Sequence, residues 1–424
     1  MLPFLLTILT LWIPIAILKP FSKSQKTVVL AVILLHLLAI FTGHYLLITQ
    51  QFPAFFAAEG FEQGPKGYPI VIDSEGDAWT YYEKTREFED YRPFSISTDK
   101  LVEVAGGRTH LGYYYVLGNL TTLTAHPVLS IRVLKTLIFF AGLACVMRVW
   151  RRNYGDPLPM YGFIFLTLLF MAPLYYNFRN LKDGLLFGLF LFYMALLDTL
   201  LRPSWQRLRP VSKSRLAVGW ALILALLWMI STLRQYYAVT LAAATVMHFI
   251  TASDMRARIR VALLVLAGVV TLFVLRSTFG QTIFDVLQTH PLTSVLAVYE
   301  MFRGLVTPIP WQFFIPSLIP THCFYLLLLP FAAFAFFARF RKNLTWHLYT
   351  VMFLIYVLGG MLGGDSALRK RLIMVPILIT WVLSYLAQKR GTHIDQTQDQ
   401  LLSQEPLLLE FSEYDRQEEL AYHT

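Results

Sequence analysis

Residues 175–193 read YYNFRNLKDGLLFGLFLFY, a short polar turn set between two apolar runs. The run before the turn extends over Leu158–Tyr176, and the run after it extends over Gly184–Leu201. Each is close to the ~20 residues that a helix needs to cross the hydrocarbon core of a bilayer. The stretch therefore predicts two membrane-spanning helices joined by a tight polar connection.

The same pattern continues in both directions along the chain. The composition agrees with it: 56% of the 424 residues are hydrophobic, 15% are charged and the mean hydropathy is +0.54, which excludes a water-soluble domain. Backbone polar groups inside a bilayer must be satisfied within the segment, so we expect helices. We predict an all-α polytopic membrane protein with about eleven spans. These are Leu2–Leu18, Thr27–Thr49, Pro127–Met147, Leu158–Tyr176, Gly184–Leu201, Leu216–Thr232, Tyr236–Thr251, Val261–Leu275, Leu318–Ala338, Leu344–Leu362 and Leu372–Ala387.

Residues 1–390 form the predicted transmembrane domain, with long loops at residues 50–110 and 277–317. The first loop is expected to carry interfacial helices, and the tyrosine-rich segment Leu111–Ala125 is expected to lie at the interface rather than cross it. Residues 391–424 form an acidic, flexible tail. Cys145 and Cys323 both lie in apolar runs, which excludes a disulfide framework.

The connectors between the spans alternate in charge. Every second one is short, basic and nearly free of acids, as in the KPFSKSQK connector of residues 19–26. The positive-inside rule places these connectors in the cytoplasm. The N-terminus is then outside and the tail inside, in a multi-pass membrane protein. This topology accounts for the net charge of +10, so we expect no nucleic-acid partner.

The first outer loop contains the most acidic stretch, Gly67–Tyr91 (GYPIVIDSEGDAWTYYEKTREFEDY). Asp73, Glu75 and Asp77 fall close together, and Asp77 opens a helical run on which it shares a face with Tyr81. Two roles suit Asp77: a cap on that helix, and a catalytic carboxylate at a membrane surface. Three carboxylates together also suit a hard divalent cation such as Mg²⁺ or Mn²⁺.

Basic residues also occur on the predicted outer side, where the orientation rule does not require them. They suit an anionic ligand such as a phosphate, although FRNLKDG alone is equally consistent with a structural Arg–Asp pair and a helix cap. The outer residues singled out are Arg179, Lys182, Asp183, Arg234, Arg303, Arg369 and Arg371.

Together these stretches resemble the C-type (GT-C) superfamily of polytopic glycosyltransferases, which use polyprenyl-phosphate-linked sugars. The likeness rests on GDAWTYYEKTREF in the first outer loop, YYNFRNLKDGLLFGLFLFY, LRQYYAVTLA and ALRKRLIMVPIL. It covers nearly the whole chain in order, through short motifs. The chain departs from the family in an extra span before the acidic loop, and it has no large soluble C-terminal domain.

The resemblance implies an enzyme that moves a sugar from a polyprenyl-phosphate donor to a lipid or glycan acceptor at the outer face. Asp77, with Asp73 as second choice, would be the general base for the acceptor hydroxyl. Arg179, Lys182, Arg234, Arg369 and Arg371 would hold the leaving phosphate, with Asp183, Tyr81 and Arg303 as further substrate-binding candidates. A metal at Asp73, Glu75 and Asp77 is an open option, and no other cofactor is expected.

Three other functions stay open at this point. A polysaccharide polymerase that acts on lipid-linked oligosaccharides also needs phosphate-binding arginines, and the acidic loop favours the transferase over it. A lipid or polysaccharide transporter would place paired charges deep within the spans and show internal repeats. The sequence shows no obvious internal repeat, and its outer charges collect at the ends of the spans rather than at the midplane. A non-catalytic scaffold of an assembly complex would use the acidic tail for docking.

Overall fold

The computed structural model describes residues 1–49, 61–63, 69–71, 77–106, 111–178, 182–201, 213–252, 263, 266, 319–339 and 367–390. For a few of these positions, Asp77, Arg369 and Arg371 among them, only the backbone is described. Within this part the chain is helical apart from one antiparallel hairpin, in which β1 (Phe61–Gln63) pairs with β2 (Pro69–Val71). The predicted tail at residues 391–424 and the second long loop at residues 277–317 lie outside it.

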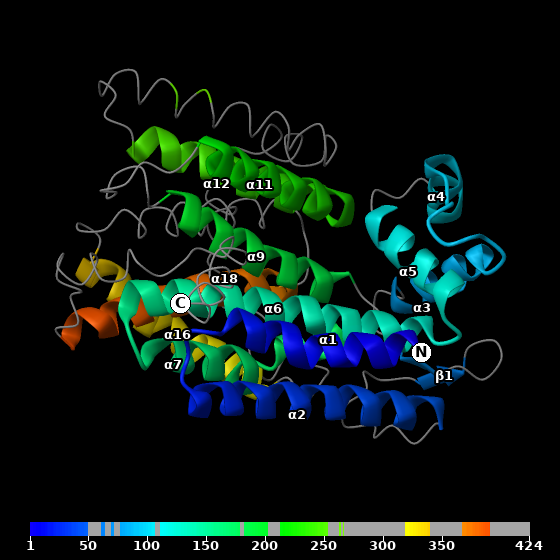
Figure 1. Ribbon diagram of the computed structural model, residues 1–424, viewed down its shortest axis with the longest axis horizontal. Helices are drawn as coiled ribbons and strands as arrows, with labels where there is room; N and C mark the ends of the chain where they lie inside the picture. Colours follow the sequence, from blue (N-terminus) through cyan, green and yellow to red (C-terminus); the bar gives the residue numbers. More distant parts are fainter. Residues whose placement is uncertain are drawn as a thin grey trace, which may run out of the picture.

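Long apolar helices run side by side and form the body of the structure (Figure 1). They are α1 (Leu2–Ile17), α2 (Lys23–Ile48), α6 (Pro127–Tyr154), α9 (Asp183–Leu201), α11 (Lys213–Leu233), α12 (Gln235–Ala252), α16 (Ile319–Arg339) and α18 (Ala367–Lys389). A bent element comprises α7 (Leu158–Ile164), a π-helical turn η4 (Phe165–Leu169) and α8 (Ala172–Phe178).

Helix α6 lies at the centre of this bundle. It packs along α1 and α9, and it also contacts α2, α5, α7, α8 and α18. Most of its side chains are buried and none is exposed, whereas α2, α11 and α16 leave large apolar side chains such as Leu38, Trp228 and Phe337 exposed. Apolar faces of that size on long helices fit a lipid bilayer as their surroundings.

The predicted class, a helical membrane protein, agrees with this architecture, but the count of about eleven spans is not confirmed. Among the described residues, six helices are long and apolar enough to cross a membrane, and the bent α7–η4–α8 element makes a seventh if it is one span. The α1 helix and the Tyr237–Met247 part of α12 are apolar but shorter. The predicted span Leu344–Leu362 lies outside the described ranges, and so does Val261–Leu275 apart from Leu263 and Leu266.

Short helices gather at one end of the bundle, which we call the α3 end (Figure 1). They are α3 (Asp77–Thr85), the 3-10 turn η3 (Arg86–Phe88), α4 (Thr98–Ala105) and α5 (Leu111–Leu123). The α5 helix covers the predicted interfacial segment Leu111–Ala125, is short for a span, and packs against α3, α4, α6 and α11.

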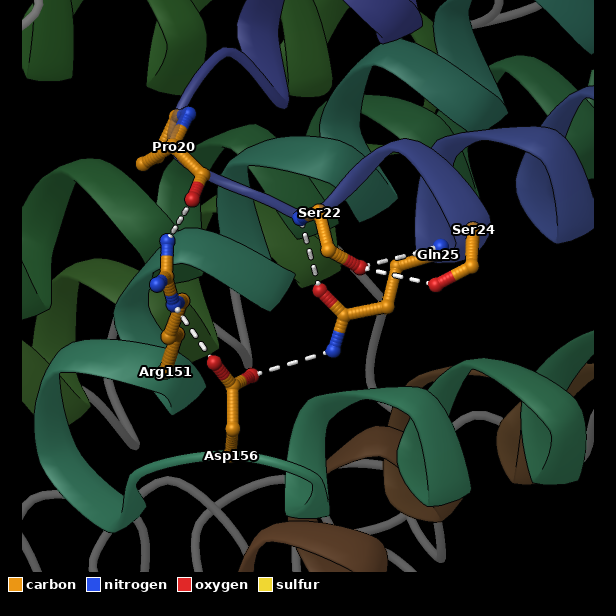
Figure 2. Close-up of polar contacts among 6 residues, drawn as sticks. All are labelled: Pro20, Ser22, Ser24, Gln25, Arg151 and Asp156. Atoms are coloured by element: carbon orange, nitrogen blue, oxygen red, sulfur yellow. Dashed lines mark hydrogen bonds and ion pairs between the residues drawn. The ribbon is translucent and has the colours of Figure 1, made fainter.

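The opposite end, which we call the Arg151 end, brings two of the predicted basic connectors together. Figure 2 shows the Arg151 guanidinium between the Pro20 carbonyl, which accepts from it, and the Asp156 carboxylate at 3.1 Å. Asp156 also accepts from the Gln25 amide at 3.2 Å. These contacts tie the α1–α2 connector to the start of α7.

Candidate functional site

Four of the residues singled out from the sequence lie close together at the α3 end: Tyr81, Lys182, Asp183 and Arg234. The Lys182 Nζ donates a hydrogen bond to the Tyr81 hydroxyl at 2.9 Å. An Arg234 Nη lies 3.2 Å from an Asp183 carboxylate oxygen. All four residues are at most 5% exposed, so the interactions form away from bulk water.

Helix ends explain why two of these charges meet. Asp183 opens α9, where a carboxylate interacts favourably with the free backbone amides of the first turn. Arg234 directly follows the C-terminus of α11, where a cation is favoured. Because α9 and α11 pack together, the two charged ends come within ion-pair distance.

Tyrosine rings of α3 and α5 form one side of the site. Tyr81 makes edge-to-face contacts with Tyr113 at 4.8 Å and Tyr114 at 5.0 Å between ring centroids. Burial raises the pKa of Tyr113 well above its ordinary value; the nearby Tyr81 and Asp183 raise it further, and Arg132 opposes them. Tyr113 therefore stays neutral at physiological pH.

Two buried cations that the sequence analysis did not single out also lie at this end, on α6. Arg132 donates to His44 Nδ1 at 2.7 Å, and its guanidinium lies 4.3 Å from the Phe178 ring centroid. Lys135 is fully buried and donates to the Tyr176 carbonyl at 3.0 Å. A signal was present in the sequence, because two cations three residues apart inside an apolar span are costly unless they face a polar interior.

The buried charges at the α3 end are mostly positive. Among the described residues that are buried there, the cations are Arg132, Lys135, Lys182 and Arg234, and the carboxylate is Asp183. Asp198, the other buried carboxylate of the described residues, pairs with Arg152 at the Arg151 end at 3.0 Å. A cationic interior behind tyrosine rings favours an anionic group as its ligand.

The other candidate residues are placed only in part. Asp77 is the first residue of α3, one helical turn before Tyr81, so the backbone of this predicted base is next to the site. Arg369 and Arg371 lie in the first turns of α18, with only their backbone described. Asp73, Glu75, Arg179 and Arg303 lie outside the described residues.

The described residues contain no candidate metal centre. No group of three or more His, Cys, Asp and Glu side chains there is arranged to hold a metal ion. The carboxylates singled out for a cation, Asp73, Glu75 and Asp77, are not among the side chains that this statement covers.

Comparisons with known proteins add no relatives to this picture. The chain matches no protein-family model, no curated protein and no solved structure.

Proposed function

We propose that this protein is a membrane glycosyltransferase that moves a sugar from a polyprenyl-phosphate donor to a lipid or glycan acceptor. The observation that supports it best is the buried cationic group around Lys182 and Arg234. Lys182 bonds the Tyr81 hydroxyl, and Tyr81 lies one helical turn after Asp77 on α3. A polyprenyl phosphate suits such a group for two reasons: cations stabilise the negative charge of its phosphate, and the apolar helices can pack against its hydrocarbon chain.

In the proposed reaction, Asp77 accepts the proton of the acceptor hydroxyl. The hydroxyl oxygen forms a bond to C1 of the sugar, the C1–O bond to phosphate breaks, and the electron pair leaves with the polyprenyl phosphate. Lys182 and Arg234 stabilise the negative charge that develops on this leaving group, and Arg132 and Lys135 add to the positive potential. Arg179, Arg303, Arg369 and Arg371 are further candidates for binding the phosphate.

The topology belongs to the same proposal. The α3 end faces the outer side of a bacterial inner membrane, and the Arg151 end, with its basic connectors, faces the cytoplasm. The N-terminus is then outside, and about eleven spans cross the bilayer.

The test is turnover by the full chain in lipid nanodiscs. Polyprenyl-phosphate hexoses and pentoses would be supplied with a membrane extract as the source of acceptor, and release of polyprenyl phosphate measured. Asp77→Asn should lower the turnover about 100-fold or more, because it removes the base and keeps the side-chain size. Glu83→Gln is the matched control, since Glu83 is exposed on the same helix, and it should retain wild-type turnover.

The outcomes separate the rival functions. Wild-type turnover in Asp77→Asn would remove Asp77 as the base. Turnover only of diphosphate-linked oligosaccharides would identify a polymerase. Binding of polyprenyl phosphate without turnover of any donor would favour a transporter or a scaffold, and the absence of both would refute the proposed function.

A further inference from the structure

The span that leads into the site is broken. The helix axis bends by 54° between α7–η4 and α8. The π-type turn closes with the Phe170 amide donating to the Phe165 carbonyl at 2.8 Å, and the next amide, of Met171, donates to the Thr321 hydroxyl of α16 at 3.2 Å. A break at this depth is tolerated because the freed backbone groups are satisfied, and such π-turns are frequent at functional sites.

Beyond the break, α8 presents its last turn to the buried cations. The Tyr176 carbonyl accepts from Lys135 of α6. The next side chain, Asn177, is only 1% exposed and lies against the first turn of α9. The contact is tight, because a Cβ at Gly184 would lie 2.5 Å from the Asn177 Oδ1 and 2.9 Å from the Tyr176 carbonyl oxygen. The amide is therefore held next to Lys182 and Asp183, which precede Gly184.

The Asn177 amide group is buried with hydrogen-bonding capacity that is not used. Its Nδ2 finds no hydrogen-bond partner anywhere in the described part of the chain. A buried donor without a partner lowers folding stability, so such groups are rare unless a ligand completes them. The buried charged groups around it are the cations Lys135 and Lys182 and the carboxylate Asp183, which lies 3.2 Å from an Arg234 Nη, and the N-terminus of α9 adds a positive helix end. An acceptor with negative charge suits this position.

We propose that Asn177 donates a hydrogen bond from Nδ2 to a phosphate oxygen of the bound polyprenyl phosphate, with Lys135 beside it as the charge partner. This inference rests on the proposed function and adds a phosphate-binding residue on the broken span. It also explains the role of the break, because the bend places the last turn of α8 between α6 and α9. Asn177 of α8 and Lys135 of α6 then bind the phosphate together, next to the start of α9.

The experiment measures lipid affinity and ligand-free stability of the full chain in nanodiscs. The probes are a short-chain polyprenyl phosphate and the polyprenol of the same chain length. Asn177→Leu keeps the side-chain size and removes the donor. It should weaken binding of the phosphate about tenfold or more, leave the affinity for the polyprenol unchanged, and leave the ligand-free Tm equal or higher.

Two further variants sharpen the result. Asn177→Asp replaces the donor with a second negative charge and should weaken phosphate binding more than Asn177→Leu does. The matched control is Asn153→Leu, the same change at the Arg151 end, where the Asn153 amide lies 3.5 Å from Asp198. It should leave both affinities unchanged.

Each result has a distinct meaning. Phosphate affinity that Asn177→Leu leaves intact would overturn the role of Asn177 while the proposed function stands. A lower Tm with equal loss of both lipids would show a structural residue and also overturn it. If the wild-type protein does not distinguish polyprenyl phosphate from polyprenol, the proposed function itself fails.

Discussion

At the scale of single residues, the Asp183–Arg234 pair has the clearest energetic consequence. Both side chains are nearly fully buried, so each charge is stabilised by its partner and would be costly alone. Asp183→Leu and Arg234→Met should each lower the free energy of unfolding by about 3–5 kcal/mol. The double variant should lose much less than the sum, because it leaves neither charge buried without the other.

The measurement is a double-mutant cycle from chemical unfolding in detergent micelles. The Arg86–Glu89 pair, at 3.1 Å and half exposed, is the control and should contribute at most about 1 kcal/mol. Additive losses at Asp183 and Arg234 would contradict the coupling. Since both residues also belong to the proposed phosphate site, turnover in these variants is a separate readout.

The sequence predicted some of these residues and missed others for a physical reason. Lys182, Asp183 and Arg234 lie in short polar turns between apolar runs, where a charge is visible against its neighbours. Arg132 and Lys135 lie inside the run Pro127–Met147, whose average hydropathy conceals them. Asn177 was passed over because a neutral amide beside a turn has many ordinary roles, and only its burial without a partner distinguishes it.

At the scale of elements, two glycines let α6 and α9 pack closely against each other. A Cβ at Gly142 of α6 would lie 2.7 Å from the Gly188 carbonyl oxygen, and a Cβ at Gly188 of α9 would lie 2.9 Å from the Phe139 backbone nitrogen. Small residues let two backbones approach in this way inside a membrane. The distance between Lys135 on α6 and Lys182 at the start of α9 therefore depends on these two glycines.

Gly188→Ala should destabilise this contact, because the new methyl group meets backbone atoms that cannot move without separating the helices. We expect a loss of about 1–3 kcal/mol, measured as a lower unfolding midpoint in detergent. The control is Gly219→Ala on α11, where the nearest atoms belong to the flexible Leu200 side chain, and its loss should be smaller. Equal losses in the two variants would show that the close approach of the α6 and α9 backbones does not contribute to stability.

Helix positions were predictable from the sequence, and the break in one of them was not. The sequence predicts one span over Leu158–Tyr176, whereas the structure divides this run after η4. Pro173 in the first turn of α8 contributes, because proline lacks an amide hydrogen and disfavours helix in the residue before it. Proline alone does not decide the matter, since α1, α16 and α18 continue through Pro14, Pro330 and Pro376. The hydroxyl of Thr321, far away in sequence, distinguishes this position.

At the scale of the whole molecule, the two ends of the bundle differ in chemistry. The Arg151 end carries the exposed residue Lys23 and the contacts of Arg151, while the α3 end carries the short helices and the buried cations. Composition was enough to predict a helical membrane protein. The number of spans was not predictable to the same degree, because runs such as Leu2–Leu18 and Tyr236–Thr251 are near the minimum length for crossing.

The proposed orientation predicts how each end reacts with a thiol reagent that cannot cross membranes. In a variant with Cys145 and Cys323 replaced, Glu83→Cys at the α3 end should be labelled on intact cells. Lys23→Cys at the Arg151 end should be labelled only after permeabilisation. The reverse pattern would place the α3 end in the cytoplasm. Labelling of both variants in intact cells would show that the two ends do not lie on opposite sides of the membrane.

The hydrogen bond between the Met171 amide and the Thr321 hydroxyl marks a hinge between α7–η4 and α8. Because the helical hydrogen-bond ladder is interrupted at Phe170, a tilt of α8 stretches no bond within α7. A lipid or protein that displaces α16 would then change the angle between α7 and α8, because Thr321 of α16 bonds the Met171 amide at the hinge. The proposed phosphate site at the last turn of α8 would then respond to changes at α16, a helix that does not belong to the site.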